Sequence, residues 1–295
     1  MARYRTPLRY PGGKQRLAPF IKEIIAENDL IGGHYVEPYA GGAGVAMELL
    51  LDGAVSHVHL NDSSYPVFAF WESVLTAPDQ LCRRIFSASL TVEEWTRRRD
   101  VVRNYAHFDV VEVGFSTLYL NRCNRSGVIS GGIIGGLDQS GPWKMDARFP
   151  RNELIQRIEA IASRGDRITV THMDAEQFML NELLRVPQHT LVYCDPPYYG
   201  QKSRLYLNKY SPADHASVAQ TIQGIGQKWV VSYDNCPPIA ELYGDRRMMV
   251  YGLQYNASRV YTGEELFIFS DNLTVPLQSS VSYLEEPLRI LASRI

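Results

Sequence analysis

Short apolar segments that alternate with helical segments constrain this chain of 295 residues more than any other feature of its sequence. Each apolar segment is short, and most are rich in Val, Ile or Tyr. Strands of this kind, separated by helices, are typical of a parallel α/β sheet. The predicted strands are His34–Glu37, His57–Leu60, Arg167–Thr171, Thr190–Cys194, Trp229–Ser232 and Leu266–Phe269, and the predicted helices are Lys14–Asn28, Gly44–Leu51, Asn152–Ser163 and Ala213–Ile225.

The segment from 67 to 150 interrupts this alternation. Helical patterns come first, and a glycine-rich stretch follows, from Gly127 to Gly141. A loop of that length inside a compact protein is usually functional or disordered. We therefore predict that residues 1–66 and 151–295 form one α/β domain, and that residues 67–150 form an inserted, mostly helical domain with a long loop. The helical patterns of the insertion are Val67–Leu75, Glu93–Val101 and Glu112–Asn121.

Charge is unevenly distributed along the chain. The formal net charge is −2, but residues 83–151 contain eleven Lys or Arg against seven Asp or Glu, and the first sixteen residues contain five basic residues and no acidic one. Two basic segments in a nearly neutral protein suit a surface that faces phosphate groups. A solvated helix face is the alternative, and we favour it for Arg97, Arg98 and Arg99, where it would add attraction for phosphate.

The remaining composition limits the cellular setting. Four scattered cysteines form no CxxC pair, so we expect reduced thiols and no zinc site. The seven histidines form no ligand cluster. The first ten residues lack the apolar stretch of a signal peptide, and no run of about 18 apolar residues could span a membrane. We expect a cytoplasmic protein that has no membrane partner and needs no metal.

A glycine-containing turn, from Glu37 to Gly44, joins the first predicted strand to the next helix. Glycines at this point let a ligand approach the backbone closely at the carboxyl edge of the sheet. Asp62 ends the second strand 21 residues after Gly41, where an acidic side chain can hold ribose hydroxyls. Because Met47 stands where a dinucleotide fingerprint needs a third glycine, a nucleoside cofactor without a pyrophosphate is the better prediction. A structural turn with a surface aspartate is the alternative.

The strongest signal is the tetrapeptide Asp195-Pro196-Pro197-Tyr198, which directly follows the buried-strand pattern Thr190–Cys194. The carboxyl end of a strand is where an α/β enzyme places its chemistry. Two consecutive prolines stiffen the turn, remove two backbone donors and leave carbonyl oxygens free to accept hydrogen bonds. An ionised aspartate likewise accepts hydrogen bonds and donates none. A proline turn that only closes the strand is the alternative.

Two such acceptors suit an exocyclic amino group, which carries two N–H donors and a lone pair that is spread into the ring. The Asp195 carboxylate and the Pro196 carbonyl could hold both hydrogens and favour a pyramidal nitrogen whose lone pair points at a methyl sulfonium. Tyr198 would supply a flat face for a purine. Stacking there would help to offset the cost of extruding the base from a duplex, which is about a few kcal/mol.

In these residues the chain resembles DNA adenine-N6 methyltransferases of the Dam type, in the alpha group of amino-methyltransferases. Arg9–Lys14 resembles the family's N-terminal cofactor motif, His172–Phe178 resembles the element that holds the adenine of the cofactor, and Glu264–Phe267 resembles the last motif, on a hairpin near the target base. The catalytic tetrapeptide, Asp195, Pro196, Pro197 and Tyr198, matches without change. The resemblance implies S-adenosylmethionine as cofactor, with contacts from Tyr10, Lys14, Glu37, Pro38, Ala40, Gly41, Gly42, Gly44, Asp62, Asp174, Phe178 and Asp195.

The resemblance covers nearly the whole chain and implies a fold and a reaction. The fold is an α/β, Rossmann-like methyltransferase sheet of seven strands, the last antiparallel, with an inserted, mostly helical target-recognition domain. The reaction is methyl transfer to adenine N6 in double-stranded DNA, with the base flipped. Cys123–Gly127, Gly131–Gly136 and Trp143–Phe149 look more like phage and restriction-modification members than like Dam itself. A GATC target is therefore not carried over, and a cognate restriction endonuclease stays open as a partner.

Polar residues of the recognition region are the candidate DNA contacts. Arginine can pair with guanine edges, asparagine with adenine, and either with phosphate, so their roles stay open, as does an ordinary surface role. A loop with Lys202, after the catalytic turn, could close over the flipped base. The candidates are Asn121, Arg122, Asn124, Arg125, Lys144, Arg148 and Lys202.

Two other functions compete with this prediction. The same fold could act on another amino group, but cytosine-N4 enzymes of this kind commonly carry Ser in place of Asp195, and RNA and protein enzymes usually carry Asn. The second competitor is a DNA-binding protein on a catalytically silent scaffold, which the intact set of motifs disfavours.

Overall fold

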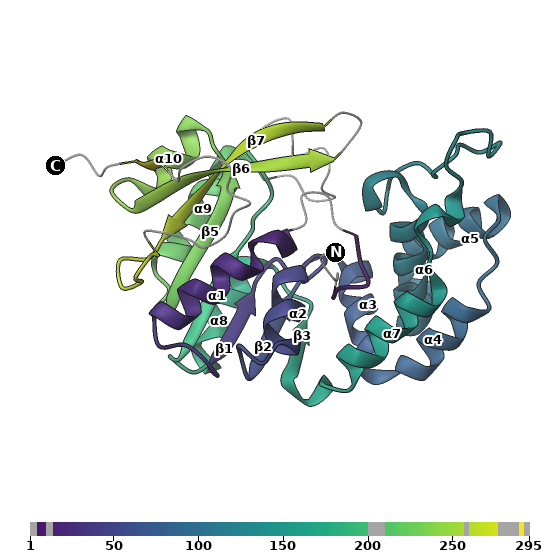
Figure 1. Cartoon of the computed structure of the whole chain (residues 1–295), viewed down its shortest axis with the longest axis horizontal. Coiled ribbons are helices and arrows are strands. Elements are labelled where there is room, and N and C mark those ends of the chain that lie inside the picture. The colour runs from purple at the N-terminus through teal and green to yellow at the C-terminus, as the bar shows by residue number, and fades with distance from the viewer. Residues whose placement is uncertain (1–4, 10–13, 200–209, 257–259, 277–288, 292–295) are drawn as a thin grey trace.

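A single mixed sheet forms the centre of the larger part of the molecule (Figure 1). The computed structural model describes residues 5–9, 14–199, 210–256, 260–276 and 289–291. The strand order is β3-β2-β1-β4-β5-β7-β6-β8. Neighbours from β3 to β5 are parallel, and β7 runs antiparallel to both β5 and β6. The strands are β1 (His34–Glu37), β2 (His57–Asn61), β3 (Ile168–Thr171), β4 (Thr190–Cys194), β5 (Lys228–Asp234), β6 (Arg247–Asn256), β7 (Val260–Phe269) and β8 (Arg289–Leu291).

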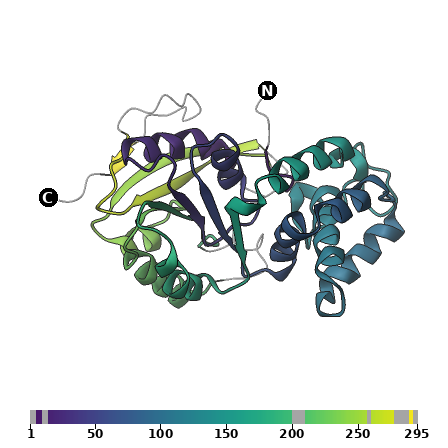
Figure 2. The same cartoon turned by 90° about the horizontal axis from the view of Figure 1, so that it is seen from below.

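The seven-stranded arrangement with an antiparallel seventh strand is confirmed, and the short β8 adds an eighth strand beside β6. Alternate residues along each strand enter different cores. In β4, Leu191 and Tyr193 join the core that includes α1 and α2, whereas Val192 and Cys194 join the core that includes α8, α9 and α10. Figure 2 shows these two helical layers on opposite sides of the sheet. The helices are α1 (Ala18–Glu27), α2 (Gly44–Leu51), α8 (Ala175–Asn181), α9 (Pro212–Gln223) and α10 (Pro237–Tyr243).

Five helices follow β2 and lie together to one side of the sheet (Figure 1). They are α3 (Tyr65–Thr76), α4 (Pro78–Phe86), α5 (Val92–Arg103), α6 (Val110–Cys123) and α7 (Arg151–Ala162). Thirteen of the fourteen residues of α6 are buried, so it is the central helix of the group. It packs so closely on α3 that a Cβ added at Gly114 would lie 2.4 Å from the hydroxyl oxygen of Ser73.

The insertion and the sheet share a continuous apolar core. Phe70 and Trp71 of α3 belong to the same core as Phe20 of α1 and Val45 of α2. The limits predicted for a separate domain, 67 and 150, therefore stay a prediction. In the structure, α3 begins at Tyr65 and α7 runs from Arg151 to Ala162.

The N-terminal segment 5–9 connects the two parts of the molecule. The Thr6 hydroxyl donates to the carbonyl of Gly42, 2.5 Å away, in the turn that follows β1. At the other end of the segment, the Arg9 backbone N–H donates to the side chain of Asn121 on α6, and the Arg9 carbonyl accepts from the same side chain. Residues 5–9 are therefore held by both the sheet and the insertion.

None of the helices within the described ranges is both long and apolar enough to cross a membrane. In the same ranges, no group of three or more His, Cys, Asp or Glu side chains is arranged to hold a metal ion.

Candidate active site

The turns that follow β1 and β4 meet at one edge of the sheet. The two strands are parallel neighbours, with Val36 opposite Val192. From this point the chain continues to β2 on one side of the sheet and to β5 on the other. Ligands of open α/β sheets bind in the crevice at such a switch point. The glycine turn and the tetrapeptide, predicted as separate signals, are therefore brought together.

Asp62, the predicted ribose-binding acid, is joined to the glycine turn, and its contact with a ribose stays a prediction. One of its carboxylate oxygens accepts the Gly41 N–H at 2.8 Å, and the other accepts the Ser64 N–H at 2.8 Å. The indole N–H of Trp71 donates to the Gly41 carbonyl at 3.0 Å, which fixes the turn from the insertion side. Burial raises the pKa of Asp62, and its two backbone hydrogen bonds act in the opposite direction.

The glycine turn also carries backbone strain. Gly41 has a φ of +46°, which a glycine adopts without cost, but Ala43 has a φ of +44°. A residue with a Cβ rarely adopts this conformation, and such strain persists only where the surroundings hold it. Ala43 directly precedes α2, so the strained residue sets the angle at which the helix leaves the turn.

Asn61 is a residue of the site that sequence reasoning missed. Its amide N–H groups donate to the carbonyls of Pro38 and Met173, each at 3.1 Å, and its oxygen accepts from the Met173 N–H and the Thr171 hydroxyl. It therefore ties the glycine turn to the end of β3. An asparagine beside the predicted ribose acid was the only signal that the sequence offered.

Two further predicted cofactor contacts lie beyond β3. Asp174 is exposed and caps α8, since its carboxylate accepts from the backbone N–H groups of Glu176 and Gln177. Phe178 is buried in the same core as Val36 and Val192. Contact of either side chain with a cofactor stays a prediction. Tyr10 and Lys202 lie outside the described residues.

The Asp195 carboxylate is held by two groups. The Ser232 hydroxyl of β5 donates to it at 2.8 Å, and Ser232 is also within 2.8 Å of the Tyr193 hydroxyl. Lys14 Nζ lies 3.5 Å from the same carboxylate oxygen. Burial raises the pKa of Asp195, the positive charge of Lys14 lowers it, and the negative charge of Glu265 raises it; the net shift is upward.

Lys14 and Glu265 form a buried ion pair behind the tetrapeptide. Glu265 is fully buried and accepts hydrogen bonds from Lys14, from the Tyr198 hydroxyl and from the Tyr251 hydroxyl. Burial alone would raise the pKa of Glu265, but the Lys14 charge and these hydrogen bonds outweigh it, so the pKa lies below its ordinary value. Both Glu265 and Asp195 therefore compete for the same cation.

Tyr198 does not present its ring to solvent, contrary to the expectation that it offers a face to a base. Tyr198 is only 3% exposed. Its hydroxyl donates to Glu265 and accepts a hydrogen bond from Lys14 Nζ at 3.0 Å. A large planar side chain with a hydrogen-bonded hydroxyl is more stable inside the protein than against water. Stacking on a purine would require this ring to be uncovered first.

Three candidate DNA contacts are buried, and that prediction is wrong for them. Asn121 is fully buried, with its amide donating to the carbonyls of Arg9 and Gly127. Arg122 is 5% exposed, and its Nε donates to the Pro7 carbonyl. Asn124 is also fully buried. These side chains satisfy backbone groups inside the fold, which leaves them no surface for DNA.

The buried role of Asn124 predicts a loss of stability when it is replaced. Its side chain accepts from the Trp95 indole N–H at 2.7 Å and donates to the carbonyls of Val128 and Ile129 at 2.9 Å. We expect Asn124→Ala to lower the free energy of unfolding by about 1–3 kcal/mol, since buried partners would be left unsatisfied. Urea denaturation measures this, with Arg125→Ala as an exposed control expected within about 0.5 kcal/mol of wild type. Equal stability of the two variants would contradict the buried role.

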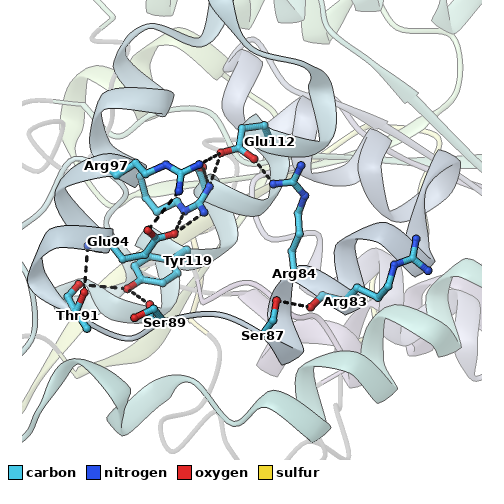
Figure 3. A network of polar contacts seen from close by, with 11 residues as sticks. Arg83, Arg84, Ser87, Ser89, Thr91, Glu94, Arg97, Glu112 and Tyr119 are labelled. Carbon is cyan, nitrogen blue, oxygen red and sulfur yellow. Dashed lines mark hydrogen bonds and ion pairs between the residues drawn. The ribbon is translucent and has the colours of Figure 1, made fainter.

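Arg125, Lys144 and Arg148 are exposed, so they remain candidates for DNA. The run Arg97–Arg99, expected to form a solvated helix face, contains both buried and exposed side chains. Arg98 is buried and bonds to Glu94 and Glu112. The more exposed Arg97 lies near the same two carboxylates (Figure 3). Arg84 of α4 completes this network on Glu112. The network therefore joins α4, α5 and α6. Of the three arginines in the run, only Arg99 forms no ion pair in the described structure.

A pocket of about 340 Å³ lies between the residues that follow Asp62 and the end of α5. Arg99 and Arg103 line it, and within the described ranges neither has a carboxylate partner within 4 Å. Arg99 instead lies over the ring of Trp95. Two arginines that form no ion pair in the described structure favour an anion. The other lining residues are Ser63, Ser64, Tyr65, Pro66, Val102, Tyr105, Leu120, Ile129 and Ser130.

Comparison with known proteins identifies one family. The model of the D12 class N6 adenine-specific DNA methyltransferases matches residues 10–257, which include the glycine turn, the insertion and the tetrapeptide. None of the curated proteins matches the chain.

Proposed function

This chain belongs to the D12 class of N6 adenine-specific DNA methyltransferases and methylates adenine in DNA, and we propose that S-adenosylmethionine donates the methyl group and that Asp195 holds the amino group. The position of Asp195 carries this proposal. Its carboxylate stands at the carboxyl end of β4, oriented by Ser232 and next to Lys14, at the edge where the glycine turn also lies.

The residues of the glycine turn fit S-adenosylmethionine. Asp62 lies against Gly41 and has carboxylate lone pairs for ribose hydroxyls. Glu37, at the start of the turn, is a buried carboxyl that forms no ion pair in the described structure, and burial raises its pKa to about 8. A ligand with positive charge on its sulfonium and amino groups suits such a carboxyl, because it would favour the ionised form. When bound, this cofactor supplies an electrophilic methyl group.

Asp195 and its neighbours would prepare the adenine. One N–H of the amino group donates to the Asp195 carboxylate and the other to the Pro196 carbonyl, which directs the nitrogen lone pair toward the methyl group. Ser232 fixes the direction of the carboxylate, and Lys14 counteracts the effect of burial on its protonation. Methyl transfer would break the bond between the methyl group and the sulfonium and leave a neutral thioether. The amino nitrogen would become cationic, and Asp195 would accept the proton that it gives up.

We assign the DNA contacts to the insertion, as a target-recognition domain for double-stranded DNA. Arg125, Lys144 and Arg148 are exposed there, and Arg99 and Arg103 line a pocket that favours an anion such as a backbone phosphate. The Asp195 side chain is 24% exposed and stands at the edge of the sheet, where it can reach adenine N6 only when the base leaves the helix, so base flipping is part of the proposal. We also propose a cytoplasmic location, which the four free cysteines support.

The donor and the product can be tested together. We expect unmodified double-stranded DNA, incubated with the protein and S-adenosylmethionine labelled in the methyl group, to yield labelled N6-methyladenine after digestion to nucleosides. Mass spectrometry distinguishes this product from N4-methylcytosine, which would mean that the pocket takes another base. Cofactor binding without any methylated nucleoside would contradict the proposal, and sequencing of the methylated sites would give the target.

A further inference from the structure

Trp143 is the most exposed of the four tryptophans. It is 70% exposed, whereas Trp71, Trp95 and Trp229 are buried. Exposing an indole to water forgoes the stabilisation that burial of an aromatic side chain provides. The Trp143 side chain is not part of the buried core and has no role in the proposed chemistry of Asp195. We therefore ask which binding partner would cover it.

An ordered loop holds Trp143 in this position. The Gln139 side chain donates to the carbonyls of Ile134 and Gly136 and accepts from the Met145 N–H. The loop is closed by the Gly141 N–H, which donates to the Gly135 carbonyl at 3.0 Å. Gly135 has a φ of +89°, and a Cβ there would lie 2.8 Å from the carbonyl oxygen of Trp143. The exposure of the indole is therefore built into the fold of the loop.

The base of the loop is anchored in the insertion. Ile133 and Met145, which flank the loop, are both buried. The Ile134 N–H donates to the Cys123 carbonyl at the end of α6, and the Arg125 N–H donates to the Gly132 carbonyl. A side chain presented by such a loop has already lost much of its freedom, so binding through it costs less entropy.

The surroundings of Trp143 indicate which partner it meets. Leu137, on the same loop, is 67% exposed, and Arg125, Lys144 and Arg148 in the same segment are exposed as well. The segment also has two exposed acidic side chains, Asp138 and Asp146, so its basic residues exceed its acidic ones by one. A large apolar side chain in a segment with this basic excess suits a duplex, where phosphates surround stacked bases. The same segment holds the remaining candidate DNA contacts, and DNA is the substrate of the family.

We propose that Trp143 enters the target duplex and stacks on bases beside the flipped adenine. This inference rests on the proposed function, since it needs the base to leave the helix. Apolar side chains that insert between base steps are used to unstack DNA, and an aromatic ring accepts any base because every base has a π-face. Trp143 would then act as a positioning residue that stabilises the extruded state, without touching the reacting nitrogen.

Tryptophan fluorescence tests the contact directly, because Trp143 is the exposed indole of the four. We expect acrylamide to quench part of the emission of the free protein, and Trp143→Phe to remove that part. Addition of a duplex that contains methylation sites should protect the quenchable part. Quenching that is unchanged in a saturated complex would overturn the proposal.

Kinetics test the role. We expect Trp143→Ala to lower kcat/KM for duplex DNA by about 5- to 100-fold, as the loss of a stacking interaction implies, and Trp143→Phe to retain most of it. The loss should shrink when the target adenine lies opposite an abasic site, because that base is easier to extrude. Phe86→Ala, which removes a 69% exposed aromatic from α4, is the matched control and should behave as wild type.

The outcomes separate this inference from the proposed function. A wild-type protein that fails to methylate DNA would refute the proposed function. A wild type that methylates DNA while Trp143→Ala has the same kcat/KM would refute only the role of Trp143. An equal loss on the normal and the abasic duplex would also refute it, since that result points to a structural defect.

Discussion

Replacing Asp195 by alanine should lower the rate of methyl transfer by about a hundred- to a thousandfold. This is the usual effect of removing one preorganised polar contact to the reacting group. The variant loses the acceptor that orients the amino group, while the Pro196 carbonyl and the glycine turn remain. We expect the protein to stay folded and to bind S-adenosylmethionine, because Asp62 and the backbone of the turn do not depend on Asp195. Single-turnover methylation of saturating duplex measures the rate.

Two controls make this result specific. Ser232→Ala removes only the hydroxyl that directs the carboxylate, so we expect a smaller loss, on the order of tenfold, for one lost hydrogen bond. Cofactor binding by calorimetry shows whether the Asp195→Ala site is intact. A rate for Asp195→Ala within tenfold of wild type, with the cofactor bound, would exclude the proposed role.

The second large effect concerns the buried pair of Lys14 and Glu265. Lys14→Met would leave the buried Glu265 carboxylate without its cation, and we expect the free energy of unfolding to fall by about 3–5 kcal/mol. The double variant Lys14→Met/Glu265→Gln removes both charges and should recover much of this loss. Guanidinium denaturation of wild type, single and double variants gives the comparison. A double variant that is as unstable as Lys14→Met would show that the pair is not the cause.

The same pair should control the pH dependence of the reaction. Asp195 accepts the amino hydrogen only when ionised, so activity falls as the pH drops through its pKa, which lies above the usual range for aspartate. Lys14 lowers this pKa more strongly than Glu265 raises it. The acidic limb of the rate profile should therefore move to higher pH in Lys14→Met and to lower pH in Glu265→Gln. Shifts in the same direction would contradict the arrangement.

Local patterns predicted the parts of this protein that local forces determine. The strands at His34–Glu37 and Thr190–Cys194 and the helix at Gly44–Leu51 were predicted to the residue, because each is a short, mostly buried segment that lies between turn residues. β6 was missed, since its mixed sequence is held as a strand by ten pairings with β7. The order of glycine turn, acid and tetrapeptide was enough to predict that these features share one edge of the sheet.

Contacts between distant residues explain the failures. Asn121 looked like a DNA contact, but it bonds to Arg9, which is 112 positions away, and no pattern around either residue reveals that contact. Asn124 and Arg122 were misjudged for the same reason. Tyr198 was expected to face a base, yet Glu265 and Lys14 hold its hydroxyl inside the protein. A sequence shows that a side chain is polar but not which buried group it serves.

The contact between Arg9 and Asn121 has a consequence for how the two ligands of the enzyme influence each other. Arg9 begins the segment that resembles the cofactor motif, and Asn121 lies near the end of α6 in the insertion, where it also donates to the Gly127 carbonyl. A Cβ on Gly127 would lie 2.2 Å from the Arg9 carbonyl oxygen, so the backbones of these two residues are in close contact. If binding at one of these segments changes the free energy of binding at the other, thermodynamic linkage makes the effect reciprocal. The factor by which the cofactor changes the affinity for DNA would then equal the factor by which DNA changes the affinity for the cofactor.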